Sequence, residues 1–364
     1  MSKIDHALAL ERRFPGIGER LARVPLTRLP TTVQPLTRLG HAVDIERLWV
    51  KRDDRTGQAY GGNKLRKLEF ILGDLKRRRR RSLITFGGIG THHGLATAIC
   101  ARQIGLRTVL VLVPQPVSAG VRSSLLLGHA HGAELHYAPT VARAAATTMG
   151  LLVRGALSGD LPAIVPPGGT SVLGTLGYVD AALELAEQVA AGELPEPDWI
   201  FVPLGSGGTA TGLALGLKLA GLRSRVAAVL VTDILAPAPA RLARLGRACL
   251  TRLRRAHSGV PHVRASAEDL TVLTGYVGRC YGAATREAED ARRLMEECEG
   301  IPLETTYSAK CLAALLAVGR RPPYGGKHLL FWNTYSSVDP ATGIARTPDF
   351  HELPRPFHRF FSPD

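Results

Sequence analysis

Residues 61–70 read Gly-Gly-Asn-Lys-Leu-Arg-Lys-Leu-Glu-Phe and are the most informative part of the chain. Upstream, residues 48–54 predict a strand that runs into a polar turn, and after the glycine pair the apolar residues fall near helical spacing. Lys64 therefore stands between flexible backbone and the start of a predicted helix. A single lysine is usually a solvated surface charge, but an amine at such a junction is able to form a Schiff base with a carbonyl cofactor when burial or neighbouring cations suppress its charge.

Elsewhere, apolar runs rich in β-branched residues alternate with helical stretches. Strands are predicted at residues 82–86, 108–113, 199–202 and 226–231, and helices at residues 91–104 and 210–220. Continuous apolar strands separated by helices indicate parallel sheets that are covered on both faces. We therefore expect an α/β protein with a large, cofactor-binding domain of residues 1–66 and 166–364 and a small domain of residues 67–165.

The bulk composition is that of a soluble globular enzyme. The chain has 364 residues, of which 45% are hydrophobic and 21% are charged, and this length is enough to bury a large core. No apolar run approaches the length needed to cross a bilayer, and charged residues break the short apolar stretch near the N-terminus, unlike in a signal peptide. We expect a cytoplasmic protein without a membrane partner.

The strong positive charge raises the question of a polyanionic partner. The formal net charge is +15 and the pI is near 10.1, with the most concentrated basic run at residues 76–81. This run ends the helix predicted to begin at Leu65, where cations face water and interact favourably with the helix dipole, and no aromatic residues are interleaved for base stacking. Specific nucleic-acid binding is therefore not expected.

Cysteine and histidine spacing indicates neither a disulfide framework nor a metal site. The five cysteines are odd in number and form no Cys-x-x-Cys pair and no Cys/His spacing suited to zinc. His92 and His93 are adjacent, but adjacent residues on a helix do not face one site. We expect reduced thiols and no bound metal.

Two glycine-rich turns each join a predicted strand to a predicted helix, at residues 87–93 and 205–209. Backbone N–H groups and the helix dipole at the second turn are suited to a phosphate dianion. Alone, that turn is equally a tight strand-to-helix connection, because it lacks the lysine of a P-loop and the glycine spacing of a dinucleotide fingerprint. Beside the Lys64 segment, the phosphate interpretation is favoured.

Residues 61–70 resemble, at ten positions in order, the cofactor-lysine segment of the pyridoxal-phosphate enzymes that include 1-aminocyclopropane-1-carboxylate deaminase and D-cysteine desulfhydrase. The resemblance continues at residues 24–31, 167–178, 204–213, 275–282 and 299–310. It implies pyridoxal 5'-phosphate as cofactor and a fold of type II that is similar to the tryptophan synthase β-subunit, with the cofactor between the two domains. It also implies a homodimer.

The same resemblance implies roles for individual residues. The implied catalytic residues are Lys64, Thr91, Tyr281 and Tyr307. The implied cofactor-binding residues are Lys64, Lys67, His92, Gly205, Ser206, Gly207, Gly208, Thr209, Tyr307, Ser308 and Thr334. The implied substrate-binding residues are Thr91, His92 and His93. Lys64 would hold the cofactor as a Schiff base and move the α-proton, and Lys67 would reach the phosphate.

Several positions depart from the family pattern. The segment Gly-Gly-x-Gln-Ser-Asn-His, which binds the substrate carboxylate and contacts the cofactor's phenolic oxygen, carries Gly90, Thr91 and His92 at its Gln, Ser and Asn positions. Ser308 replaces the Glu of the cyclopropane deaminases, and an uncharged partner at the pyridine nitrogen favours an unprotonated ring with a weaker electron sink. Tyr335 and Ser336 follow Thr334 where the family has two glycines, and they would crowd the cofactor crevice or force the turn to take another path.

These residues favour a pyridoxal-phosphate dependent lyase or deaminase that acts on a small amino acid substrate. We expect α,β-elimination from a β-substituted amino acid, similar to D-cysteine desulfhydration, which releases a 2-oxo acid and ammonia. Three alternatives stay open. They are a β-replacement synthase of a specialised amino acid, a 1-aminocyclopropane-1-carboxylate deaminase, and a catalytically silent regulatory protein that binds the cofactor.

Overall fold

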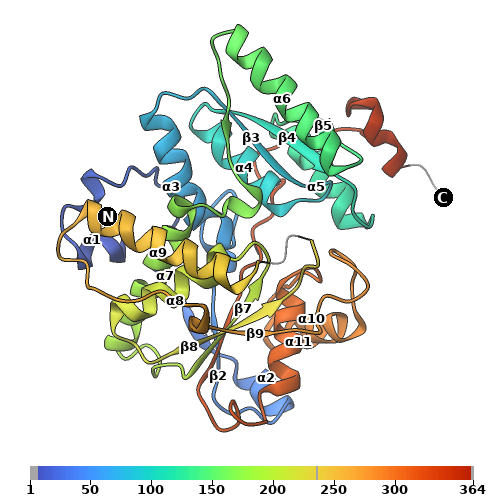
Figure 1. Cartoon of the computed structure of the whole chain (residues 1–364). Coiled ribbons are helices and arrows are strands. Elements are labelled where there is room, and N and C mark those ends of the chain that lie inside the picture. Colours follow the sequence, from blue (N-terminus) through green and yellow to red (C-terminus); the bar gives the residue numbers. More distant parts are fainter. Residues whose placement is uncertain (1–6, 235–236, 362–364) are drawn as a thin grey trace. The chain divides into compact units, whose positions relative to one another are not determined.

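The computed structural model describes residues 7–234 and 237–361. Contacts divide the chain into two compact units, one of residues 1–70 and 170–338 and the other of residues 71–169 and 339–364 (Figure 1). Each unit has its own sheet and its own apolar core. Helix α3 (Asn63–Arg77) begins in the first unit and ends in the second.

The first unit is built on a six-stranded sheet with the order β1-β2-β10-β7-β8-β9. The strands are β1 (Val33–Pro35), β2 (Leu48–Lys51), β7 (Trp199–Leu204), β8 (Arg225–Leu230), β9 (Leu270–Leu273) and β10 (Leu329–Trp332). All neighbouring pairs are parallel except β1 with β2. Parallel strands are usually connected by a helix that crosses over the sheet. The alternation of strand and helix patterns in the sequence therefore predicts a parallel sheet of this kind.

Both faces of this sheet are covered, as its apolar strands require. Along β7, Trp199 and Phe201 pack into the core that holds α2 (Thr37–Ala42), α10 (Arg286–Glu299) and α11 (Ser308–Val318). Ile200 and Val202 point to the opposite face and pack with α7 (Val172–Ala190) and α8 (Gly208–Ala220). This alternation follows from the two-residue period of a strand.

The second unit has a four-stranded parallel sheet with the order β5-β4-β3-β6. Its strands are β3 (Ser82–Gly88), β4 (Arg107–Val113), β5 (Glu134–Tyr137) and β6 (Ala163–Ile164), and its long helices are α4 (His92–Gln103), α5 (Ala119–Ala130) and α6 (Val141–Leu157). Together the two sheets confirm the predicted α/β class with parallel sheets flanked by helices.

The remaining elements are short apart from one helix. They are α1 (Ala9–Arg13), α9 (Pro239–Ala256) and the 3-10 segments Ile17–Glu19, Asp53–Arg55, Pro167–Gly169, Ala267–Asp269, Phe350–Glu352 and Arg355–Phe360. Within the described residues, no helix is long and apolar enough to span a bilayer.

The C-terminal segment differs from the expected domain assignment. The sequence placed residues 166–364 in the large domain, but residues 339–364 belong with the second unit. Leu353 and Phe357 are buried in the core of that unit beside Leu110 and Leu135. These contacts hold the segment there, and a sequence rich in proline and charge gave no sign of them.

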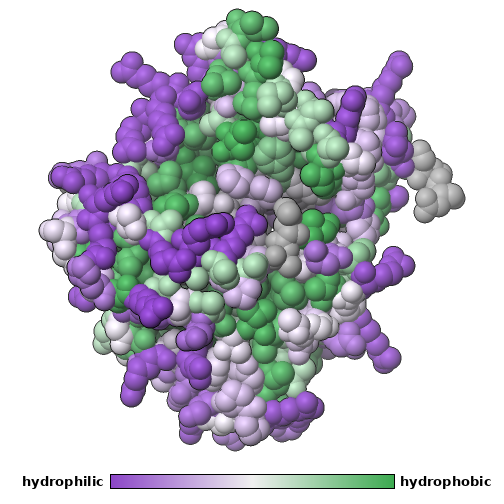
Figure 2. Space-filling model, viewed as in Figure 1, coloured by the Kyte–Doolittle hydropathy of each residue, from purple (hydrophilic) through white to green (hydrophobic). Residues whose placement is uncertain are grey.

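Helix α3 ends at Arg77, so Lys76 and Arg77 of the basic run lie in its last turn, as predicted, while residues 78–81 lie beyond the helix. Arg77 and Arg78 form ion pairs with Asp74 on the same helix, and Arg80 donates to the carbonyl of Leu161. Apolar side chains are exposed elsewhere in the same unit, where α6 presents Val141, Met149, Val153 and Leu157 to solvent (Figure 2).

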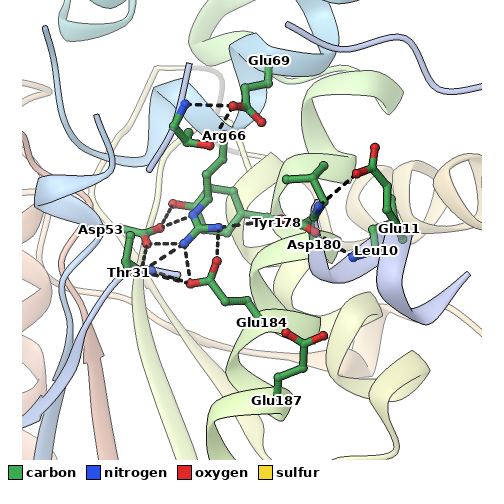
Figure 3. A network of polar contacts seen from close by, with 12 residues as sticks. Leu10, Glu11, Thr31, Asp53, Arg66, Glu69, Tyr178, Asp180, Glu184 and Glu187 are labelled. Atoms are coloured by element: carbon green, nitrogen blue, oxygen red, sulfur yellow. Dashed lines mark hydrogen bonds and ion pairs between the residues drawn. The ribbon is translucent and has the colours of Figure 1, made fainter. Parts of the chain in front are cut away.

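A buried ion-pair network fixes the start of α3 in the first unit (Figure 3). Arg66 is 1% exposed and forms bidentate pairs with two carboxylates. Its Nε and NH2 donate to Asp53 at 3.0 and 2.8 Å, and its NH1 and NH2 donate to Glu184 at 3.0 and 2.9 Å. Burial alone would lower the pKa of Arg66, but these two carboxylates raise it well above its ordinary value, so Arg66 is charged.

The network includes a second residue of α7, which also carries Glu184, and extends to β2 and β10. Tyr178 of α7 and Trp332 of β10 both donate to Asp53 at 2.7 Å, while Lys51 of β2 donates to Glu184 at 2.6 Å. Burial would raise the pKa of Glu184, but Arg66 and Lys51 lower it far below its ordinary value. Because every member is buried and bonded, α3 is attached at one point to β2, α7 and β10.

Replacing Arg66 by methionine should be strongly destabilising. Asp53 and Glu184 would stay buried without their cation, and breaking such a pair costs roughly 3–5 kcal/mol. Urea unfolding followed by tryptophan fluorescence measures the loss. The control is Arg12→Met, because the Arg12–Glu187 pair is 41% and 43% exposed and should contribute less than about 1 kcal/mol. Equal effects of the two substitutions would contradict this prediction.

Candidate active site

Lys64 lies in the first turn of α3, directly after a tight backbone passage. Gly62 has a φ of 81°, and a Cβ at this position would lie 2.6 Å from the carbonyl oxygens of Thr334 and Tyr335. Only glycine fits there without strain. The Lys64 amine donates to Asn63 Oδ1 at 2.7 Å, and Asn63 Nδ2 donates to Thr209 Oγ1 at 3.1 Å. The lysine is thus linked through Asn63 to the glycine-rich loop.

The amine of Lys64 is easier to deprotonate than an ordinary lysine amine. Burial of the amine lowers the pKa of Lys64 from 10.5 to about 8, and the charge of Glu304 offsets part of that effect. About a tenth of the amine is then neutral at pH 7, far more than for an unperturbed lysine. The amine also lies 5.7 Å from the centroid of the Tyr307 ring. Lys64 therefore has the properties of a nucleophilic lysine.

The loop at residues 205–209 joins β7 to α8 and leaves the start of α8 accessible to an anion. Gly207 has a φ of 94°, and no side chain caps the N-terminus of the helix. A Cβ at Gly205 would lie 3.2 Å from the Tyr307 ring, and one at Gly208 would lie 2.9 Å from Thr170 Oγ1. The glycines thus keep a cradle open beside uncapped N–H groups, which suits a phosphate.

Lys67 lies one helical turn beyond Lys64 and faces the same cradle. Its amine would be 3.3 Å from a Cβ at Gly208, and the residue is 2% exposed. Burial lowers the pKa of Lys67 well below its ordinary value, and the charge of Lys64 lowers it further. A phosphate dianion at the start of α8 would reverse this effect, so the residues present fit such a group. Ser206, also in the loop, shares a hydrogen bond of 2.6 Å with Thr170.

Two tyrosines lie together near Lys64. The hydroxyl groups of Tyr281 and Tyr307 are 2.5 Å apart, and the two rings meet edge to face at 5.9 Å between centroids. The backbone N–H of Tyr281 donates to Asp233 at 2.9 Å. Burial raises the pKa of both tyrosines, so both hydroxyl groups are protonated near neutral pH. The pair is able to pass a proton from one oxygen to the other.

Ser308 and Thr334 occupy buried positions at the edges of this group. Ser308 begins α11, and its hydroxyl accepts the backbone N–H of Glu304 at 3.0 Å. The carbonyl of Thr334 accepts the backbone N–H of Asn63 at 3.2 Å, which ties the end of β10 to the start of α3. The carbonyl of Tyr335 packs against Gly62, and the prediction that its side chain crowds a cofactor stays a prediction.

The turn at residues 87–93 belongs to the second unit, as do Thr91, His92 and His93. Thr91 caps α4 by accepting the N–H of Gly94 at 3.2 Å. His93 Nε2 lies 3.1 Å from Thr85 Oγ1, whose hydrogen is donated to the carbonyl of Val165 at 3.0 Å. Since that hydroxyl has only one hydrogen, Nε2 of His93 is the donor to Thr85.

Sequence reasoning missed several polar residues near these groups, namely Asn63, Gln115, Thr170 and Glu304. Gln115 accepts the N–H of Gly90 at 3.2 Å, while Asn63 joins Lys64 to the loop. Asn63 was visible, because it stands inside the string that contains Lys64. Nothing in the sequence distinguished Gln115 or Thr170 from ordinary loop residues.

Comparison with known proteins agrees with this geometry. A family profile described as "Pyridoxal-phosphate dependent enzyme" matches residues 24–334. A D-cysteine desulfhydrase of Klebsiella pneumoniae (strain 342) is 33% identical over 302 residues, which cover 82% of this chain and 88% of the relative. A putative 1-aminocyclopropane-1-carboxylate deaminase of Pyrococcus furiosus is 32% identical over 334 residues, covering 88% of this chain and 94% of the relative.

Solved structures give the same result for the fold. The structure of a homologue of 1-aminocyclopropane-1-carboxylate deaminase superposes with a TM-score of 0.74 at 30% identity and covers 88% of this chain and 94% of that one. Threonine deaminase isoform 2 from Solanum lycopersicum superposes with a TM-score of 0.59 at 16% identity, covering 91% of this chain and 85% of that one, and supports the fold alone. These findings confirm the family resemblance and the type II fold.

The pKa of Lys64 predicts its reactivity in the cofactor-free protein. Only the neutral amine attacks an acylating reagent, so the reaction rate should rise with pH through a midpoint near 8 instead of 10.5. Competitive labelling with residue-level mass spectrometry measures the profile. Lys76, exposed at the end of α3, reports the reagent's own pH dependence in the same sample. A Lys64 profile that coincides with that of Lys76 would contradict the lowered pKa.

Proposed function

We propose that this chain, which belongs to the family of pyridoxal-phosphate dependent enzymes, is a lyase that eliminates the β-substituent of a small amino acid. The observation that carries the proposal is the position of Lys64. Its partly neutral amine lies at the start of α3, linked to the loop at residues 205–209 and beside the Tyr307 ring. This arrangement suits a cofactor that has both a carbonyl group and a phosphate.

The chain is an enzyme that depends on pyridoxal 5'-phosphate, and the residues of the first unit have separate tasks in the proposed reaction. When bound, the cofactor supplies an electron sink for the negative charge that develops at the substrate's α-carbon. Lys64 would hold the cofactor through its amine, and the same amine, once free, would remove the α-proton as general base. Lys67 and the loop at residues 205–209 bind the phosphate, and Tyr307 packs its ring beside the cofactor.

The remaining groups orient the substrate and handle the leaving group. Tyr281, with its protonated hydroxyl, donates a proton to the departing β-substituent. Thr91 and His92, at the start of α4, bind the substrate carboxylate, because a helix N-terminus favours an anion. His93 supports this turn through Thr85. Ser308 and Thr334 are proposed to contact the pyridine nitrogen.

D-cysteine is the substrate that we propose first, because several relatives that cover most of this chain are D-cysteine desulfhydrases. Loss of the α-proton and of the thiol leaves an enamine, which water hydrolyses. One D-cysteine and one water then give one pyruvate, one hydrogen sulfide and one ammonia. Ser308, which lacks the charge of a glutamate, suits a substrate whose leaving group takes the electrons.

A second candidate function is opening of the 1-aminocyclopropane-1-carboxylate ring. It is favoured by the Pyrococcus furiosus relative and by the solved homologue, both of which have names that refer to this activity. Thr91 and Ser308 argue against it, because they replace the serine and glutamate of the cyclopropane deaminases. We also propose that the protein is a homodimer in the cytoplasm, which light scattering and cell fractionation test.

Product analysis tests the proposed function. The purified protein should be yellow, and borohydride should fix the cofactor on Lys64. D-cysteine should give equal amounts of pyruvate, sulfide and ammonia, and Lys64→Ala should abolish their formation. Production of ammonia and 2-oxobutyrate from the cyclopropane substrate alone would favour the second candidate. Formation of a new amino acid that carries an added thiol at its β-carbon, instead of pyruvate, would indicate β-replacement. A yellow protein that reacts with no member of a panel of amino acids would indicate a regulatory protein.

Tyr281→Phe removes the hydroxyl that is proposed to protonate the leaving group. Loss of a general acid lowers kcat by roughly 10²- to 10⁴-fold, while KM should change little because the ring stays in place. A substrate with a better leaving group, such as β-chloro-D-alanine, needs less protonation and should lose much less activity. Equal losses on both substrates would show that Tyr281 acts elsewhere in the reaction.

A further inference from the structure

Glu304 organises the start of α11 and was absent from the expected site residues. Its Oε1 accepts the backbone N–H groups of Tyr307 at 2.9 Å and Ser308 at 2.8 Å, and its Oε2 accepts that of Thr306 at 2.7 Å. Charge-assisted bonds of this kind are among the stronger hydrogen bonds in proteins. A single carboxylate therefore fixes the backbone of the two residues proposed to contact the cofactor.

The hydroxyl of Ser308 is bonded to the same residue. Its Oγ accepts the N–H of Glu304 at 3.0 Å and lies 3.2 Å from both the carbonyl oxygen and Oε1 of Glu304. Both of those oxygens only accept, so in the cofactor-free protein the hydroxyl hydrogen is directed to Glu304, and a pyridine nitrogen would compete with Glu304 for that hydrogen. The side-chain rotamer of Ser308 is thereby fixed together with its backbone.

Ionisable groups face Glu304 from each neighbouring element. They are Lys64 of α3, Tyr281 after β9, Tyr307 before α11, Lys310 of α11 and Tyr335 after β10. Burial raises the pKa of each of the three tyrosines, so they are neutral near pH 8. Lys310 donates to the carbonyl of Val277 at 2.6 Å. The Glu304 carboxyl group is thus set among tyrosine hydroxyls and lysine amines.

We infer that Glu304 is a positioning residue: its carboxylate holds Tyr307 and Ser308 in place and, through Tyr307, whose ring centroid is 5.7 Å from the Lys64 amine, stands near enough to that amine to favour its charged form. The inference rests on the proposed function for the roles of Tyr307 and Ser308 toward the cofactor. Its electrostatic part concerns Lys64 in the cofactor-free protein and is measurable whatever the substrate is. A carboxylate that only capped α11 would have no effect on the titration of Lys64.

Glu304→Gln tests the electrostatic part. The amide keeps the size of the side chain but removes its charge, so the neutral form of Lys64 is favoured and the midpoint of its acylation profile should fall by roughly one pH unit. Glu304→Asp keeps the charge on a shorter side chain, and its midpoint should stay close to that of the unmodified protein. Thermal unfolding of each variant shows whether the fold is intact.

The matched control is Glu299→Gln. Glu299 Oε1 also accepts a backbone N–H, that of Leu39 at 2.9 Å, and joins α10 to α2. Its loss should lower thermal stability without moving the Lys64 midpoint. In a folded protein, an unchanged midpoint in Glu304→Gln would overturn the inference. A fall of similar size in Glu304→Asp or in Glu299→Gln would overturn it as well, because charge would then not be the cause.

Cofactor binding tests the other half of the inference, that Glu304 holds Tyr307 and Ser308 in place. Glu304→Gln should bind pyridoxal 5'-phosphate at least several-fold more weakly and shift the absorbance band of the bound cofactor, since Tyr307 and Ser308 lose their fixed backbone. Glu304→Asp should restore most of both properties. Unchanged affinity and absorbance would overturn this part. Failure of the unmodified protein to bind the cofactor at all would count against the proposed function, while the Lys64 profile would still decide the electrostatic part.

Discussion

The buried guanidinium of Arg66 joins the start of α3 to the rest of the first unit. An arginine that is 1% exposed must have all its donors satisfied, and the two carboxylates that do so come from the turn after β2 and from α7. Tyr178, also of α7, and Trp332 of β10 add hydrogen bonds to one of these carboxylates, so the position of α3 is set by three elements at once. Lys64 and Lys67 flank Arg66 in sequence and inherit that fixed position.

Lys64, Arg66 and Lys67 lie on one turn of α3, and their pKa values are shifted differently because their charged neighbours differ. Arg66 has two carboxylates and stays charged. Lys64 has only the influence of Glu304 against its burial and reaches a pKa of about 8, while the pKa of Lys67 is lowered well below its ordinary value by burial and by Lys64. These differences suit a site that binds a phosphate and needs a nucleophilic amine. Arg66 stays charged whatever is bound, while the charges of Lys64 and Lys67 would change when a ligand binds.

The sequence was informative where backbone requirements are local. Glycines at 62 and 207 have positive φ, and both lie in motifs that were recognised. Strands β3, β4, β7 and β8 were predicted from apolar runs, since a strand covered on both faces has little other choice of residue, whereas the shorter strands β1, β5, β6 and β9 were not predicted. The role of Glu304 depends on the backbone conformation just before α11. The burial of Phe357 depends on residues that are far away in the chain. A single sequence does not contain that information, although Glu304 four residues before Ser308 is a pattern compatible with a helix cap.

The residues that keep the family pattern and those that depart from it have different proposed roles. In the first unit, Lys64, Lys67 and the loop at residues 205–209 keep the family's residue types, and their geometry suits a phosphate and a reactive amine. In the second unit, Thr91 and His92 change the turn proposed to receive the substrate carboxylate, while Thr91 still caps α4 and so preserves the start of that helix. A change that leaves the cap intact alters the groups offered to a ligand without disturbing the backbone. Selection for a different amino acid, with the lysine and the phosphate loop retained, would produce this combination, whereas loss of catalysis would have left the lysine and the phosphate loop free to change as well.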